Sequence, residues 1–119
     1  MIGWMLAVMI ALSLTLAVGP TDAGDVARGQ KVNAERCAKC HGKTGKGDGA
    51  SLKKLDVDVK PVDWTDKKAM AKWNDADTAK IIRQGGKGIG KSEVMPAYQG
   101  KLSDAEIDDL LAYIRSLSK

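Results

Sequence analysis

Two cysteines and one histidine within five residues are the side chains of this sequence best suited to chemistry. Cys37, Cys40 and His41 form the run Cys-Ala-Lys-Cys-His, and the chain contains no other cysteine or histidine. This spacing is typical of c-type haem attachment, in which each thiol adds to one porphyrin vinyl group and the adjacent imidazole binds the iron. We therefore predict one covalent haem c, tethered through Cys37 and Cys40, with His41 as an axial iron ligand.

Other uses of this pattern are less consistent with the rest of the chain. A structural zinc site needs four Cys or His ligands, and only three such side chains are present. A thioredoxin-like redox pair would follow a strand, whereas a helix-like segment precedes Cys37. Both alternatives are therefore disfavoured.

The second axial position has two candidate ligands outside the N-terminal segment, Met70 and Met95. Met70 stands between Ala69 and Ala71 in a helical pattern, where methionine usually fills the core. Met95 precedes Pro96 in an irregular stretch, and the proline stiffens the loop that carries it. We predict Met95 as the ligand, with Met70 or an open sixth position as the alternatives.

The elements that must hold these residues are predicted to be helices joined by glycine-rich loops. Asp25 can cap a first helix to about Lys39, which delivers the cysteines at its end. Short helices are expected over 66–73 and from 74 to 83, the second stopped by Gly85 and Gly86. No segment alternates like a strand, so the predicted fold class is all-α.

The last helix carries the clearest signal. Ser103 and Glu106 form a capping box, and an apolar stripe follows at helical spacing. The first helix is its best packing partner, with Gly29 allowing close approach and Tyr113 near the crossing. The stripe consists of Ile107, Leu110, Leu111, Ile114 and Leu117.

The N-terminus resembles a targeting segment. Residues 2–18 are uncharged and mostly apolar, and small residues near Ala23 are typical of a cleavage site. We predict that residues 1–23 are a signal peptide, with an uncleaved membrane anchor as the alternative, and that residues 24–119 form one exported domain. Exclusion of residues 1–23 removes one Asp and raises the net charge from +4 to +5.

Lysines are frequent around the loops next to the predicted haem site. They form either an ordinary solvated surface or a basic rim that steers docking to an acidic redox partner. No basic helix with interleaved aromatic residues is present, so nucleic acid is not an expected partner. The lysines concerned are Lys43, Lys46, Lys53, Lys54, Lys60, Lys87, Lys91 and Lys101.

The order of these motifs resembles a class I monohaem c-type cytochrome. The attachment run is followed by the Gly-Lys-Gly-Asp-Gly loop, then by residues 94–98 with Met95, then by the capped last helix. The resemblance implies the cytochrome c fold, thioether bonds from Cys37 and Cys40, axial ligation by His41 and Met95, and electron transfer in the bacterial periplasm. A closed His/Met site predicts an electron carrier of relatively high reduction potential, not an enzyme.

Two other functions and one departure from the family stay open. The chain is alternatively a membrane-anchored haem subunit of a larger oxidoreductase complex, or an enzyme or gas sensor with a displaceable Met95. Family members usually fix the ring of the axial histidine with a proline carbonyl about ten residues later. Here the first later proline is Pro61, so the partner of the His41 ring N–H is open. Trp64 is expected in the haem pocket or the core, and Tyr98 in the pocket or on the surface.

Overall fold

The structure is a computed structural model that describes residues 24–55 and 60–119. Residues 1–23 lie outside this part, so their assignment as a signal peptide or anchor stays a prediction. None of the helices in the two described ranges has the length and apolar character needed to cross a bilayer. Every named element in these ranges is helical, which agrees with the predicted all-α fold.

The first helical run carries the chain from Asp25 to the cysteines. Helix α1 spans Val26–Val32, and the Asp25 carboxylate caps it by accepting the Arg28 N–H at 2.8 Å. A π-helical turn, η1, follows over Asn33–Cys37, and α2 continues over Ala38–His41. The predicted helix is thus present, but the π turn was not expected. It adds one residue to a helical turn and so rotates the later side chains about the helix axis.

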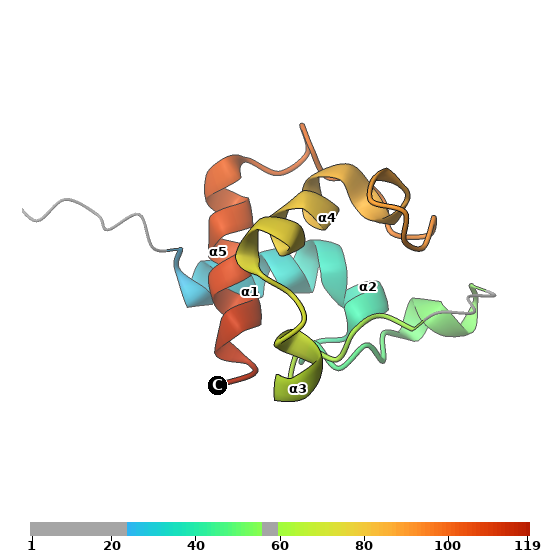
Figure 1. The fold of residues 1–119 in the computed structure, drawn as a ribbon, viewed down its shortest axis with the longest axis horizontal. Coiled ribbons are helices and arrows are strands. Elements are labelled where there is room, and N and C mark those ends of the chain that lie inside the picture. Colours follow the sequence, from blue (N-terminus) through green and yellow to red (C-terminus); the bar gives the residue numbers. More distant parts are fainter. Residues whose placement is uncertain (1–23, 56–59) are drawn as a thin grey trace, which may run out of the picture.

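Helix α5, Asp104–Ser116, crosses α1 in the centre of the molecule (Figure 1). The predicted capping box is present, and Ile107, Leu110 and Ile114 are each 1% exposed. At the crossing, a Cβ on Gly29 would overlap the Asp109 carbonyl oxygen and lie 2.8 Å from the Tyr113 Cβ. The predicted crossing of the first and last helices at Gly29 and Tyr113 is therefore confirmed.

A buried carboxylate ties the same two helices together. The Asp109 side chain accepts hydrogen bonds from the Asp25 N–H at 2.7 Å and from the Arg28 Nε at 3.0 Å. These donors, Arg28 first, hold the pKa of Asp109 below its usual value. The crossing is thus fixed by backbone contact and by a charge-assisted hydrogen-bond pair.

The middle of the chain forms two short elements and one longer helix. They are the 3₁₀ turn η2 (Ala50–Lys53), α3 (Lys67–Met70) and α4 (Asp75–Gly88), and the Asn74 side chain caps α4. The expected stop at Gly85 is only partly right. Gly85 takes a positive φ of 73° and interrupts the helical geometry, yet one more helical turn follows to Gly88.

Arg115 of α5 fixes the junction between α3 and α4. Its Nε donates to the Asp75 carboxylate at 2.6 Å, and its NH2 group donates to the Trp73 carbonyl at 2.5 Å. Because α5 also packs on α1, the junction that carries Trp73 has a fixed place relative to the first helix.

Candidate functional site

A cavity of about 740 Å³ lies between two parts of the chain. We call residues 36–49 and 60–64 the histidine wall, and residues 89–98, which follow α4, the methionine wall. Cys37, Cys40 and His41 line the cavity from the histidine wall, and Met95 lines it from the methionine wall. Cofactor pockets generally enclose about 300–1,000 Å³, so this volume suits a large flat ligand. All four predicted site residues therefore meet at one cavity.

Backbone hydrogen bonds hold the attachment run in the histidine wall. The loop after α2 folds back, so that the Gly47 N–H donates to the His41 carbonyl at 2.8 Å and the Gly49 N–H to the Cys40 carbonyl at 3.0 Å. Asn33 adds a side-chain bond, in which its Nδ2 donates to the Gly42 carbonyl at 3.3 Å. The glycine-rich loop predicted from the sequence thus supports the attachment run from outside the cavity.

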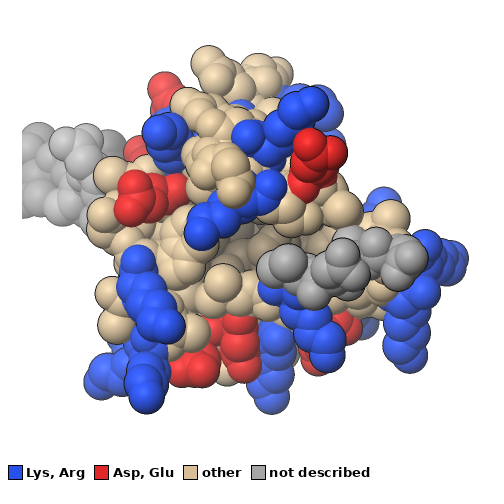
Figure 2. All heavy atoms as spheres, turned by 45° about the vertical axis from the view of Figure 1, so that its right-hand side comes forward, with Lys and Arg blue, Asp and Glu red and all other residues tan. Residues whose placement is uncertain are grey.

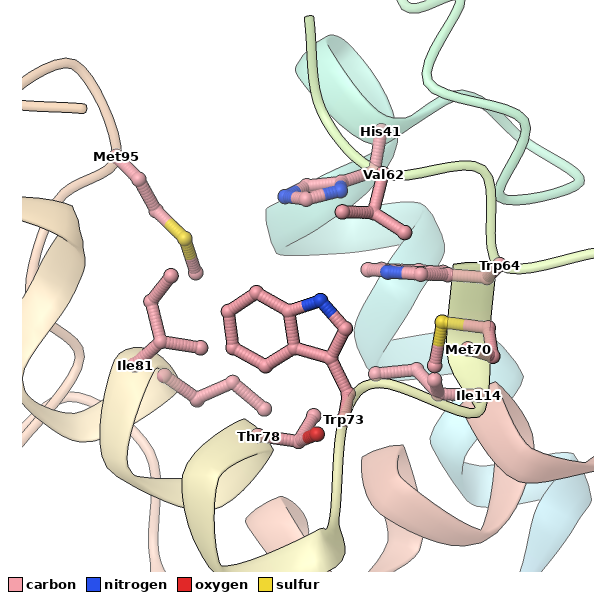
Figure 3. Close-up of a pocket in the computed structure, with 10 residues that line it drawn as sticks. His41, Val62, Trp64, Met70, Trp73, Thr78, Ile81, Met95 and Ile114 are labelled. Carbon is pink, nitrogen blue, oxygen red and sulfur yellow. The ribbon is translucent and has the colours of Figure 1, made fainter. Parts of the chain in front are cut away.

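The His41 imidazole lies at the border of the cavity, stacked against the indole of Trp64 (Figure 3). The ring centroids are 4.5 Å apart and the ring planes differ by 17°. Burial lowers the pKa of His41 to about 4, so the ring is neutral at neutral pH and keeps a lone pair for a metal. The Nδ1 atom is buried and has no hydrogen-bond partner among the described residues.

Both cysteines are half-buried and neither forms a disulfide. Burial, with a smaller contribution from nearby Cys40, raises the pKa of Cys37 to about 11. The Cys37 thiol is therefore protonated at neutral pH. Thiols placed side by side, unpaired and facing a cavity are suited to forming two covalent bonds with one bound molecule.

Backbone hydrogen bonds join the methionine wall to α4. The Gly86 N–H donates to the Met95 carbonyl at 3.1 Å, and the Tyr98 N–H donates to the Ile82 carbonyl at 3.0 Å. Tyr98 lines the cavity and is half-buried, and its hydroxyl donates to the Arg36 carbonyl at 2.9 Å. Of the two positions proposed for Tyr98, the pocket is therefore the one observed.

The two candidate methionines occupy different surroundings. Met95 lines the large cavity, whereas Met70 is 3% exposed and belongs to the apolar core. Met70 also lines a smaller apolar cavity of about 70 Å³, together with His41, Trp64 and Met95. Met70 thus lies in the core, the position that its helical context suggested.

Trp73 is the principal site residue that the sequence did not single out. Its indole stands in the middle of the view in Figure 3 and lines both the large and the small cavity. It precedes the Asn74 cap, and a large aromatic residue at a junction between helices was the one available signal. Trp64, for which pocket and core were both considered, is 8% exposed, belongs to the core cluster and touches the His41 ring.

Basic side chains surround the mouth of the cavity. Arg36, Lys60 and Lys91 belong to its lining. Figure 2 shows Lys and Arg side chains above and below the hollow, with acidic side chains mostly farther from it. Two of the lysines predicted to form a basic rim, Lys60 and Lys91, thus lie at the opening.

The donor set and the cavity together fit a haem. Two unpaired thiols, a neutral imidazole and a thioether face one space of cofactor size, and apolar residues such as Val62 and Ile81 form much of the remaining lining. Imidazole and thioether are ligands that haem iron accepts, and neighbouring thiols serve covalent attachment.

Comparisons with known proteins point the same way. Residues 26–118 match the family model described as Cytochrome c. The cbb3-type cytochrome c oxidase subunit FixP of Bradyrhizobium diazoefficiens is 33% identical over 99 residues, which cover 82% of this chain and 30% of that protein. The chain spans about a third of the length of the first curated relatives it matches.

Two smaller proteins align over nearly their whole lengths. Cytochrome c-554(547) of Halothiobacillus neapolitanus is 30% identical over 95 residues, which cover 80% of this chain and 99% of that protein. The solved structure of cytochrome c6 from the diatom Phaeodactylum tricornutum superposes with a TM-score of 0.54 at 23% identity, covering 78% of this chain and 93% of that one. The latter likeness supports the fold.

The family match includes the attachment run, both walls of the cavity and the two crossing helices. Fold, cavity and relatives therefore agree on one identification. The chain belongs to the cytochrome c family, whose members transfer electrons through haem, and it carries one covalently bound haem c.

Proposed function

We propose that this protein is an electron carrier whose haem is tethered by Cys37 and Cys40 and ligated by His41 and Met95. The observation that supports this most directly is the single cavity that all four side chains line. The bound haem supplies an iron that gains or loses one electron. With both axial positions filled by side chains of the protein, no position is left for a substrate, which favours electron transfer over catalysis.

Each side chain contributes a defined property. The two thiols supply covalent attachment, and His41 offers an unprotonated nitrogen because burial keeps its pKa low. The Met95 thioether is a soft, uncharged ligand, and the apolar lining from Val62, Trp73 and Ile81 keeps water away. A soft ligand in an apolar pocket favours ferrous over ferric iron, so a relatively high reduction potential is expected.

The test of the ligand set compares the two methionines. Met95→Ala should abolish the weak far-red sulfur-to-iron band of the oxidised protein and allow carbon monoxide to bind the ferrous form, while the haem stays covalently attached. Met70→Ala is the matched control, because it removes the same side chain from the core. It should lower the free energy of unfolding by about 2–5 kcal/mol and keep the band. Loss of the band in Met70→Ala alone would assign the ligand to Met70.

The proposed partner is an acidic redox protein that docks over the cavity mouth. Arg36, Lys60 and Lys91 supply positive charge there, and such charge accelerates association in a salt-dependent way. Lys60→Glu and Lys91→Glu should slow electron transfer to an acidic acceptor at low ionic strength. Lys72→Glu makes the same charge change at an exposed position outside the lining and should have little effect. Equal slowing by all three would point to net charge instead of a docking site.

Export is part of the proposal. Residues 1–23 have the composition of a signal peptide, and c-type attachment with periplasmic electron transfer fits the resemblance on which the assignment rests. The intact mass of the native protein should correspond to residues 24–119 plus one haem. A mass equal to that of residues 1–119 without haem would contradict both processing and attachment.

A second candidate is a haem subunit held at the membrane. It is favoured by the likeness to FixP, which is a subunit of a cbb3-type cytochrome c oxidase, and by the apolar residues 2–18. Membrane fractionation with N-terminal sequencing separates the two candidates. Retention of residues 2–18 and recovery in membranes support the subunit, whereas a mature start near Gly24 supports the soluble carrier.

A further inference from the structure

The contact between His41 and Trp64 is the feature of the site that the proposed electron transfer does not yet use. The two rings lie nearly parallel, with centroids 4.5 Å apart and planes 17° from each other (Figure 3). This geometry is that of a favourable stacked aromatic pair. The imidazole of the attachment run therefore packs face to face on a residue from a later loop.

Trp64 is itself held firmly. Its backbone N–H donates to the Gly45 carbonyl at 2.8 Å. A Cβ on Gly45 would lie 2.7 Å from Trp64 Cε3 and 2.9 Å from Leu117 Cδ1, so Gly45 packs closely between the indole and Leu117. Next to it, the Asp63 carboxylate accepts from both the backbone N–H and the hydroxyl of Thr65, at 2.8 and 2.6 Å. The indole is thus a rigid support for the imidazole.

The usual alternative support is a hydrogen bond. A metal-bound histidine almost always donates its second ring N–H to a carboxylate, a carbonyl or water, which fixes the ring and makes it a stronger donor to the metal. In the described residues the His41 Nδ1 atom is buried without such a partner. The stacked indole of Trp64 can orient the imidazole, as a hydrogen bond would, but it does not add electron density to the imidazole.

We propose that Trp64 is the positioning residue of His41, which orients the imidazole by stacking and shields its Nδ1–H from water, and thereby raises the reduction potential. This inference rests on the proposed function, in which His41 is an axial ligand. With no acceptor for Nδ1 among the described residues, the imidazole donates less charge to the iron, and the ferric state is stabilised less.

The experiment compares Trp64→Leu with Trp64→Phe in the haem-loaded protein. Leucine removes the stacked ring and opens space beside Nδ1, so that water can accept the N–H. We expect a lower reduction potential and a broadened or shifted g anisotropy in the electron paramagnetic resonance spectrum of the oxidised form. Phenylalanine restores a flat ring and should return both readouts toward the wild-type values.

Met70→Leu is the matched control for a loosened core. Met70 lines the same small cavity as Trp64 and His41, but the stacked pair consists of Trp64 and His41 alone. This variant should leave potential and g anisotropy unchanged. In the wild-type protein, the nitrogen and proton shifts of the ferrous His41 Nδ1–H provide a readout that needs no variant, and they should report an N–H without a strong acceptor.

Each outcome bears on one claim. Wild-type potential and g anisotropy in Trp64→Leu, equal changes in Met70→Leu, or a strongly hydrogen-bonded Nδ1–H in the wild type would each overturn the role of Trp64. Such results leave His41 ligation intact. The spectrum of the oxidised wild-type protein is recorded first. If it lacks the low-spin signature of His/Met ligation, the proposed function is overturned instead.

Discussion

The two walls of the cavity are built in different ways. The histidine wall contains its own support, because the N–H groups of Gly47 and Gly49 bond back to the attachment run and Trp64 stacks on His41. The methionine wall depends on α4, to which it is bonded through Lys91, Met95 and Tyr98, and Val94 beside Met95 is 43% exposed. We infer that the histidine wall is the fixed half of the site and the methionine wall the half that gives way first.

The largest effect is expected from a substitution at the α1–α5 crossing, which supports both walls. Gly29→Val would place side-chain atoms in the space of the Asp109 carbonyl and the Tyr113 Cβ at the α1–α5 crossing. Overpacking against backbone should cost about 3 kcal/mol of unfolding free energy, the upper end of the usual range. Thermal unfolding followed by circular dichroism measures it, with Ala27→Val on an exposed position of α1 as control. Equal melting temperatures for the two variants would show that α1 and α5 can move apart at the crossing without loss of stability.

The next largest effect is expected at Met95 in the methionine wall. Gly85 and Gly90 have nearly equal positive φ values, 73° and 70°. A Cβ on Gly85 would lie 2.7 Å from the Met95 carbonyl oxygen, whereas a Cβ on Gly90 meets nothing within 4 Å. Both alanine variants carry a positive-φ strain of about 1–3 kcal/mol, but only Gly85→Ala should also displace Met95.

Loss of the far-red band on heating reports that displacement. In Gly85→Ala the band should disappear well below the temperature at which helicity is lost. In Gly90→Ala the two transitions should stay as close as in the wild type. A band equally stable in both variants would mean that the Met95 loop adjusts without cost.

Much of this arrangement followed from local sequence signals. The Ser103 capping box and the Gly29 crossing depend on a few neighbouring residues or on helical spacing, and both were confirmed. The π turn at Asn33–Cys37 was not predicted, because no short pattern distinguishes it from an α-helix. The position of Trp73 and the stack of Trp64 on His41 depend on how distant segments pack, which periodicity does not encode.

Low pH should destabilise the α1–α5 crossing and should affect the two walls of the cavity equally. The pKa of Asp109 lies below its usual value of 3.8 because the folded protein stabilises the carboxylate, chiefly through Arg28. The contribution of Asp109 to the free energy of unfolding is complete above the pKa of the unfolded state. It is lost as the pH falls through the pKa of the folded state. Asp109→Asn should lower stability at neutral pH by about 1 kcal/mol and flatten the acid limb below about pH 4. Denaturant titrations against pH test this, and an unchanged acid limb would assign it to other carboxylates.

The smallest expected effect concerns the bond between the walls. Tyr98→Phe removes a hydroxyl that donates to the Arg36 carbonyl at 2.9 Å, and should cost about 0.5–1 kcal/mol. Tyr113→Phe removes a comparable bond, from α5 to the Lys43 carbonyl at 3.2 Å. We expect only Tyr98→Phe to lower the temperature at which the far-red band disappears more than the temperature of global unfolding. Identical behaviour of the two variants would remove the distinction between the walls.

The hydrogen bond from Asp25 to Asp109 joins residues 84 positions apart, so the two ends of the domain meet only when its synthesis is complete. The attachment run at 37–41, by contrast, follows the first helix directly and is therefore synthesised early. Closing such a long loop costs only about 0.6 kcal/mol more for each doubling of its length. The large separation in sequence therefore adds little to the free-energy cost of the α1–α5 crossing, and α5 is the element whose packing completes the fold.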